Sequence, residues 1–386
     1  MKENGGPARA RVAVVKCDNY NAKEVKQAVE RGIELIGGCT NLVQPGEKIL
    51  LKPNLLAPDT PEKCVTTHPS VFRAVAEIFQ AAGAVLSYGD SPAISSPERT
   101  AKKAGIMAVA EELGIKMADF SHGEEVAFAE GIQNKKFTIA RGVLANDGII
   151  SLPKLKTHGL TRLTGAIKNQ FGCIPGVLKG EFHVKLPELD DFARMLVDLN
   201  RLLRPRLYIM DGIMAMEGNG PRSGQPRKMG VLIISTDPVA LDATVCRLVN
   251  LPPQDIATLR LGQEMGLGTC NPAAIDLVGD PLTDLVKDDF VASRRSRAMN
   301  MKSTWARNRI VSRPQINENK CVKCGICIQM CPVKPAVVNW RKGDKTKPPV
   351  YDYNRCIRCY CCQELCPEGA ISLHTPLLGR VLSLRS

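Results

Sequence analysis

The sequence has no uninterrupted apolar run of the roughly 18 to 20 residues that a membrane-spanning helix needs. Its start, Met1 to Arg11, also lacks the apolar core of a secretory signal peptide. We therefore expect a soluble, cytoplasmic protein that does not bind a membrane. Aromatic residues make up only 4 % of the chain and are not interleaved with basic residues. Stacking on single-stranded nucleic acid is therefore poorly supported, and we do not expect nucleic acid as a partner.

Two common nucleotide-binding motifs are also absent. No phosphate-binding G-x-x-x-x-G-K-[ST] motif is present, and no dinucleotide fingerprint follows a strand. The glycine-rich segment from Gly218 to Gly224 lacks the required lysine, and the Gln225-Pro226 that follows does not open a helix. We interpret this segment as a shaped, ligand-facing loop and predict no nicotinamide cofactor.

Acidic residues are in the minority, with 39 Asp and Glu against 52 Lys and Arg and a formal net charge of +13. This balance favours anionic small molecules, acidic redox partners or nucleic acid, and charge alone does not choose among them. Residues 293–314 concentrate basic charge without any acid. We interpret this segment as a basic linker, which is either a solvated tether or a docking strip for an acidic partner or for the acidic face of a C-terminal module. Its charged residues are Arg294, Arg295, Arg297, Lys302, Arg307, Arg309 and Arg313.

The 386 residues are more than one hydrophobic core usually organises, so we expect a large domain with an appended module. Residues 1–292 alternate short β-branched runs with longer helical patterns, which predicts an α/β domain with a mostly parallel sheet and crossover helices. Asn21, with Glu24 three residues on, favours a helix start, and another helix is expected from Ser70 to Ala82. Strands are expected at 12–17, 48–52, 85–88, 148–152, 207–210, 230–235 and 275–278.

Cysteine is concentrated near the C-terminus, where nine of the fifteen fall between Cys321 and Cys366. Such clustering indicates metal binding and not disulfides. Two runs share the spacing C-x2-C-x2-C-x3-C followed by proline. These runs are Cys321, Cys324, Cys327 and Cys331 before Pro332, and Cys356, Cys359, Cys362 and Cys366 before Pro367.

The two matched runs predict two 4Fe-4S clusters, because each cluster needs four thiolates and the fourth comes from the other run. Zinc is the alternative, but a structural zinc site uses four ligands and would not need two matched sets. Cys361 is expected to be a bystander, since its use would leave four residues before Cys366 instead of three. The two ligand sets are Cys321, Cys324, Cys327 and Cys366 for one cluster, and Cys356, Cys359, Cys362 and Cys331 for the other.

This stretch resembles the bacterial two-cluster ferredoxins, whose known role is one-electron transfer at low potential. The resemblance implies a small α+β ferredoxin-like domain, which we place at residues 315–375, followed by a tail at 376–386. The insertion from Asn339 to Pro349, rich in Lys and Pro, is interpreted as a surface loop.

Polar residues follow several of the predicted strands. In open α/β sheets the carboxyl ends of the strands form the crevice where ligands bind, so these residues are expected to converge. Lysine and histidine side chains suit a carboxylate or phosphate, and His68 and His158 are candidates for a general acid or base near neutral pH. The alternatives are solvated surface lysines and structural histidines. The catalytic candidates are His68, His158, Lys156 and Asp90; the ligand- or cofactor-binding candidates are Lys52, Asn54, Lys154, Lys168, Asn169 and Asp211.

These motifs resemble the family catalogued as domain of unknown function 362, some of whose members carry an iron-sulfur module in the same C-terminal place. The match runs from about Val12 to Pro252. It implies the fold and the domain order, and the family offers no established substrate or reaction. The residues that carry it are Lys52-Pro53-Asn54, Thr67-His68-Pro69, Gly89-Asp90-Ser91, Lys154, Lys156-Thr157-His158, Lys168-Asn169, Asp211-Gly212, Glu217-Gly218-Asn219-Gly220 and Asp237-Pro238-Val239-Ala240.

The sequence favours an iron-sulfur redox protein whose clusters relay electrons to or from an anionic substrate or cofactor in the crevice, with a redox partner protein. One alternative is a non-catalytic electron carrier, sensor or maturation factor. Another is a redox-neutral enzyme, such as a racemase or lyase, whose clusters are structural. Whether the protein is an enzyme stays open; if it is, an iron-sulfur oxidoreductase is expected.

Overall fold

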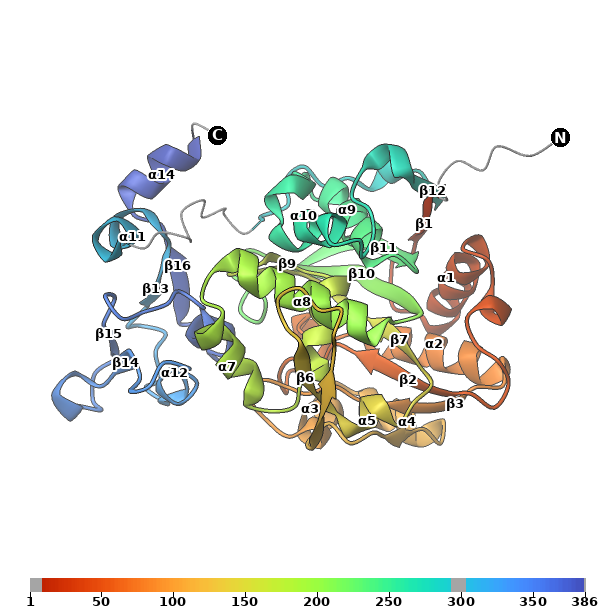
Figure 1. Ribbon diagram of the computed structural model, residues 1–386, viewed down its shortest axis with the longest axis horizontal. Helices are drawn as coiled ribbons and strands as arrows, with labels where there is room; N and C mark the ends of the chain where they lie inside the picture. Colours follow the sequence, from red (N-terminus) through yellow and green to blue (C-terminus); the bar gives the residue numbers. More distant parts are fainter. Residues whose placement is uncertain (1–8, 293–302, 385–386) are drawn as a thin grey trace.

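The computed structural model describes residues 9–292 and 303–384, and a ten-stranded sheet dominates the larger part (Figure 1). Most neighbouring strands are parallel, and β11 is antiparallel to both of its neighbours, β1 and β10. This arrangement confirms the expected α/β class. The order along the sheet is β12 (Ile275–Gly279), β1 (Ala10–Lys16), β11 (Gln225–Ser235), β10 (Leu207–Glu217), β7 (Gly148–Leu152), β2 (Lys48–Pro53), β3 (Val85–Tyr88) and β4 (Lys116–Met117).

Several short strands were not predicted from the sequence, and one of them carries candidate site residues. Residues Lys154–His158, expected to be a loop after β7, form β8, which pairs in parallel with β10 and antiparallel with β9 (Arg162–Thr164). Pro153 separates β7 from β8. The chain therefore continues past the carboxyl end of β7 as a second short strand. The motif residues of this segment therefore lie on a rigid element and not on a loop.

Helices cover both faces of the sheet. Helices α1 (Ala22–Leu35), α2 (Pro69–Ala81) and α4 (Ile106–Glu112) bury apolar side chains on one face, and α8 (Leu189–Leu203) and α9 (Pro238–Leu248) do so on the other. Asn21 caps α1 as expected, since its side chain accepts hydrogen bonds from the backbone of Lys23 and Glu24. The remaining elements of this part are α3 (Pro97–Lys103), α5 (Arg141–Leu144), α6 (Ala166–Asn169), α7 (Leu178–Lys185), α10 (Ala257–Glu264) and the hairpin β5 (Gly123–Ala127) and β6 (Lys136–Ala140).

The C-terminal part is a small α+β unit, as the resemblance to the two-cluster ferredoxins implied. In each run a short helix follows the second cysteine, and the residue before that helix has a left-handed backbone: Gly325 (φ 76°) and Tyr360 (φ 62°). Tyr360 tolerates this conformation in a buried place where its hydroxyl donates to the carbonyl of Ser312 at 2.8 Å. The elements are α11 (Thr304–Ile310), β13 (Arg313–Ile316), α12 (Ile326–Gln329), β14 (Val338–Asn339), β15 (Val350–Tyr351), α13 (Cys361–Glu364), β16 (Ile371–His374) and α14 (Leu377–Leu384).

The expected basic linker falls partly outside the described residues, which omit 293–302. The rest of it, 303–314, forms α11 and the first residues of β13, so ordered elements occupy this stretch. Among the described residues no helix is both long and apolar enough to cross a membrane.

The glycine-rich loop between β10 and β11 receives the C-terminal part. Gln363 Nε2 donates to the carbonyl oxygens of Asn219 (3.0 Å) and Gly220 (3.2 Å). In return Asn219 Nδ2 donates to the carbonyl of Ile371 at 2.9 Å, and Arg222 donates to that of Leu365 at 3.2 Å. This loop was expected to face a ligand, and most of its polar contacts join the cysteine-rich part to the α/β part.

Candidate functional site

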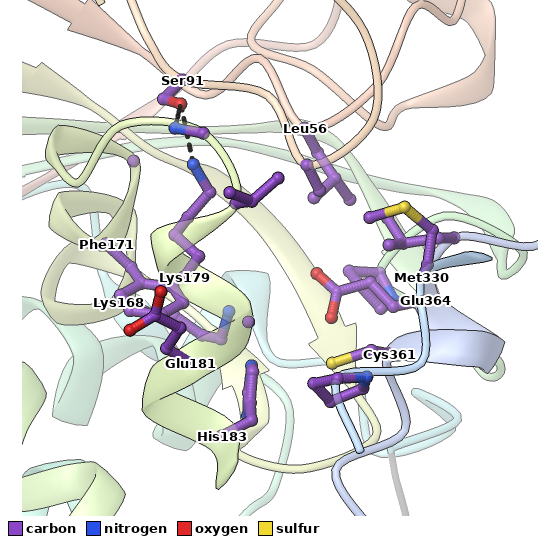
Figure 2. Close-up of a pocket in the computed structure, with 18 of the residues that line it drawn as sticks. Leu56, Ser91, Lys168, Phe171, Lys179, Glu181, His183, Met330, Cys361 and Glu364 are labelled. Atoms are coloured by element: carbon purple, nitrogen blue, oxygen red, sulfur yellow. Dashed lines mark hydrogen bonds between the residues drawn. The ribbon is translucent and has the colours of Figure 1, made fainter. Parts of the chain in front are cut away.

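A cavity of about 580 Å³ lies between the α/β part and the C-terminal part. One wall comes from β8, from the loops after β2 and β3, and from the segment that leads into α7. The opposite wall comes from the ends of α12 and α13, and Figure 2 shows Cys361 and Glu364 on that side, facing α7. Residues far apart in the sequence therefore enclose one space of the size typical for a small-molecule ligand.

The structure divides the predicted site residues into two adjoining groups. The residues that line the cavity are Asn54, Asp90, Lys156, His158, Lys168 and Asn169. The residues that do not line it are Lys52, Lys154, His68 and Asp211. The expectation that Lys52, Lys154, Lys156 and His158 share one pocket therefore holds for the last two and fails for the first two, which are buried against acidic partners.

Amides hold Lys156 at the cavity wall. Its ammonium donates to Asn54 Oδ1 at 2.9 Å and to the carbonyl of Val65 at 2.6 Å. Asn54 Nδ2 donates in turn to Asn169 Oδ1 at 3.1 Å, and Asn169 Nδ2 donates to Ser151 Oγ at 2.9 Å. All the hydrogen-bond partners of Lys156 are neutral, so its charge is left for a ligand.

A buried ion pair supports the adjoining wall. Lys52 Nζ lies 2.9 Å from Asp90 Oδ1, with side-chain exposures of 0 % and 5 %. The other oxygen of Asp90 accepts from the backbone of Leu55 at 2.6 Å. A Cβ at Gly172 would lie 1.8 Å from Asp90 Oδ1, so this close approach requires glycine. Asp90 is therefore held by a cation and a backbone donor on its inner side.

Apart from Lys52, the residues outside the lining are grouped around Asp211. Its carboxylate accepts from Lys154 Nζ and from the hydroxyl of Tyr20, each at 2.8 Å, and from the backbone of His68 at 2.9 Å. The rings of Tyr20 and His68 stack with centroids 3.5 Å apart. Tyr20 was missed, although it follows the carboxyl end of β1 and the same positional rule applies to it.

Both histidine candidates are neutral near pH 7, which differs from the sequence expectation. Burial lowers the pKa of His68 to about 4 and that of His158 to about 4. In His68, Nδ1 accepts from the backbone of Ser70 at 3.1 Å and so caps α2. In His158, Nδ1 accepts from the backbone of Leu160 at 3.0 Å. The second ring nitrogen of each neutral imidazole then carries the proton.

The proton-bearing Nε2 of His158 faces Glu364, whose Oε2 lies 3.5 Å away. Burial alone would raise the pKa of Glu364, but His158 and Lys168 hold it well below its usual range. The carboxylate therefore lies charged in the cavity wall. It belongs to α13, so the C-terminal part supplies an acidic group to a site whose other polar groups come from the α/β part.

Helix α7 contributes residues that the sequence analysis missed. Lys179 Nζ donates to Ser91 Oγ at 2.7 Å and to the carbonyl of Ile174 at 2.9 Å (Figure 2). Burial lowers the pKa of Lys179 to about 8, with Asp90 opposing and Lys52 adding to that effect. The other candidates were selected because they follow predicted strands. No strand directly precedes α7, so that criterion did not select Lys179.

The cavity carries more positive than negative charge. Within the described ranges, no carboxylate lies within ion-pair distance of Lys156, Lys168 or Lys179. Of the acids in the lining, Asp90 is paired with Lys52 and Glu181 with Lys185. Lysine side chains without acidic partners in a partly buried space favour an anionic ligand.

The affinity of this cavity for an anion should fall as pH rises through about 7. Burial lowers the pKa of Lys156 to about 7; Glu364 and Asp90 oppose this, while Lys168 and Lys154 add to it. Lys156 is charged below that pH and neutral above it, so anion affinity should decline by up to about tenfold per pH unit above 7. Fluorescence titration with 8-anilinonaphthalene-1-sulfonate measures this, because the sulfonate stays ionised throughout.

In Lys156→Met the decline near pH 7 should disappear and leave a weaker one near 8, where Lys179 titrates. The matched control is Lys185→Met, which removes an exposed lysine from the rim of the same cavity and should keep the wild-type profile. A flat pH profile in the wild-type protein would contradict the assignment of Lys156 to anion binding.

The eight cysteines of the two runs line two further small cavities. One is lined by Cys321, Cys324, Cys327 and Cys366, and the other by Cys331, Cys356, Cys359 and Cys362. Each set takes three residues from one run and the fourth from the other. Cys361 is absent from both linings and lies in the wall of the large cavity. Four thiols around one small space fit the donor set of an iron-sulfur cluster.

Comparison with known proteins identifies both parts of the chain. The family described as "Domain of unknown function (DUF362)" matches residues 49–247, and the "4Fe-4S dicluster domain" matches residues 320–370. A thylakoid-associated protein of Synechocystis sp. is 35 % identical over 267 residues, which cover 69 % of this chain and 82 % of that protein.

Two solved structures are more distant. The lactate racemase apoprotein of Thermoanaerobacterium thermosaccharolyticum is 12 % identical with a TM-score of 0.40, and the match covers 63 % of this chain and 57 % of that one. A protein from Thermotoga maritima is 12 % identical with a TM-score of 0.36 and coverages of 65 % and 60 %. This chain thus spans less than two thirds of either. From its family matches, the chain belongs to the DUF362 family and carries a C-terminal iron-sulfur-binding domain of the 4Fe-4S type.

Proposed function

We propose that this protein holds two 4Fe-4S clusters and passes electrons between them and an anionic ligand in the large cavity. The observation that carries this proposal is the position of Cys331, which lines both the large cavity and one four-cysteine cavity. A ligand in the large cavity would therefore lie against the protein groups that hold that cluster. When bound, such clusters supply one-electron transfer.

The cross-paired cysteines support two clusters. Each four-cysteine cavity has its own complete set of thiols, and each set unites two segments that the sequence separates by the insertion 339–349. Cys327, Cys362 and Cys366 also share one buried cluster of side chains, so the two cavities are neighbours. Adjacent cavities of this kind suit a relay from one cluster to the other.

The cavity lining indicates the chemistry of the ligand. Lys156, Lys168 and Lys179 suit a carboxylate or phosphate group. The same space is also lined by Leu56, Phe171, Val177, Met330 and Leu365, which suit an apolar body. We therefore propose an anion with an apolar portion as the substrate or cofactor.

The relay is tested with the ligand itself, identified by mass spectrometry of small molecules that remain bound after anaerobic purification. If the ligand prefers one oxidation state of the protein, linkage requires that it shift the cluster potential in proportion. A tenfold preference corresponds to about 59 mV for a one-electron couple. We expect a shift of this size in electrochemical titrations, and transfer of electrons from the reduced protein to the ligand.

Lys156→Met should reduce the shift by weakening binding, and Lys185→Met should preserve it. A ligand that binds with no shift and accepts no electrons would instead favour a carrier or a protein whose clusters are structural.

A further inference from the structure

The cavity lined by Cys321, Cys324, Cys327 and Cys366 shares no residue with the large cavity and opens toward the surface. Cys324, one of its four cysteines, is exposed, whereas Cys331, Cys356 and Cys362 of the other cavity are buried. We call this the outer site and the other four-cysteine cavity the inner site; in the proposed relay, electrons enter or leave through the outer site. The surface around Cys324 is therefore the place to look for a redox partner.

The insertion 339–349 packs beside this outer site. Lys323 Nζ, next to Cys324, donates to the carbonyl of Thr346 at 3.1 Å. A Cβ at Gly325 would lie 3.5 Å from the Trp340 ring, and Pro349 lines the four-cysteine cavity itself. One hydrogen bond and two close approaches thus place the insertion beside the loop that carries Cys321 and Cys324. It is a surface loop, as expected, and it also forms the border of the outer site.

This border is basic. Its acids are Glu318, Asp344 and Glu368, and Asp344 is engaged by the backbone and hydroxyl of Thr346. No ion pair between described residues neutralises any of the border's cations. We call these cations the basic rim; they are the exposed residues Lys320, Lys323, Arg341, Lys342, Lys345 and Lys347.

We propose that the basic rim docks an acidic one-electron carrier protein, which exchanges electrons with the outer cluster. This rests on the proposed redox function and adds its partner. In each exchange the carrier loses one electron and the cluster gains it, or the reverse, with no bond made or broken. Charge complementarity selects an acidic protein, and the exposed Cys324 beside Lys323 of the rim selects one that transfers electrons.

The test uses the cluster-loaded full chain without any cavity ligand and an acidic plant-type ferredoxin as the probe. Lys342→Glu, Lys345→Glu and Lys347→Glu are combined, since these side chains are exposed and their charge reversal leaves the described hydrogen bonds intact. We expect the Kd for the ferredoxin to rise, and the second-order rate of electron exchange to fall, by about tenfold or more at low salt. Iron content and the visible absorption of the clusters should stay at their wild-type values.

The matched control combines Lys23→Glu, Lys102→Glu and Lys116→Glu, which make the same change in net charge at exposed positions of the α/β part. It should alter the Kd less than twofold. An equal loss in this control, or no loss in the rim variant, would overturn the proposal. So would a DNA duplex that binds the rim as tightly as the ferredoxin does.

A second measurement does not depend on the variant being folded. The wild-type exchange rate should fall steeply with ionic strength, because exposed charges are screened. A rate independent of salt would contradict docking by charge. Because no cavity ligand is present, failure here leaves the relay to the cavity untouched, and failure of the relay leaves this surface untouched.

Discussion

Replacing Cys331 with alanine is expected to halve the iron content of the anaerobically reconstituted chain, from about eight atoms to about four. Cys331 is the cysteine that the first run supplies to the cavity of the second, where it meets Cys356, Cys359 and Cys362. The other set keeps all four of its thiols. Iron and sulfide analysis, together with electron paramagnetic resonance of the reduced protein, measures the loss.

Cys361→Ala is the matched control, because Cys361 is as buried as its neighbour Cys362 but lines the large cavity. It should retain about eight iron atoms and alter ligand affinity alone. Unchanged iron in the Cys331→Ala variant would refute the cross-paired assignment, and so would zinc in place of iron in the wild-type protein.

The second large effect concerns stability. Replacing Asp90 with asparagine leaves the ammonium of Lys52 buried without a counter-charge, and breaking such a pair costs about 3–5 kcal/mol. Urea unfolding of the variant should show this loss in the free energy of unfolding. The double variant Lys52→Met with Asp90→Asn should cost less than the sum of the single changes, because the two groups are coupled.

An exposed ion pair gives the comparison. Glu125 lies 2.9 Å from Lys136 with both side chains more than half exposed, so Glu125→Gln should change stability very little. If Asp90→Asn proved as mild as Glu125→Gln, the pair could not be what holds this wall of the cavity.

Local patterns in the sequence predicted much of this structure. The cysteine spacing predicted the two sets of four, and the seven expected strands are all present, because hydrophobic runs and cysteine runs are properties of neighbouring residues. The domain boundaries drawn from these patterns, at 292, 314 and 375, remain predictions.

Pairings between distant strands could not be predicted. Lys154, Lys156 and His158 alternate along β8 and so share a face, yet Lys154 does not line the cavity. In the β8–β10 register it lies opposite Asp211, and its ammonium is paired with that carboxylate. The register of the sheet brings together residues more than fifty positions apart in the sequence. Local sequence patterns do not predict this register.

Glu364 was hidden for a related reason. It stands between the cysteines Cys362 and Cys366, where the spacing directs attention to the metal, while its carboxylate faces His158 of the α/β part. The contact between Glu364 and His158 depends on how the C-terminal part packs on the α/β part. The sequence of either part alone does not predict that packing.

The single helical turn α13 limits how the C-terminal part can be exchanged for another domain. Four consecutive residues, from Cys361 to Glu364, supply a thiol to the large cavity, a cysteine to the inner cluster site, an amide to the glycine-rich loop and a carboxylate to His158. A chimera that exchanges the C-terminal part for a free ferredoxin would therefore lose one wall of the ligand cavity together with its anchor. Only a transplant that keeps this turn would yield a complete site.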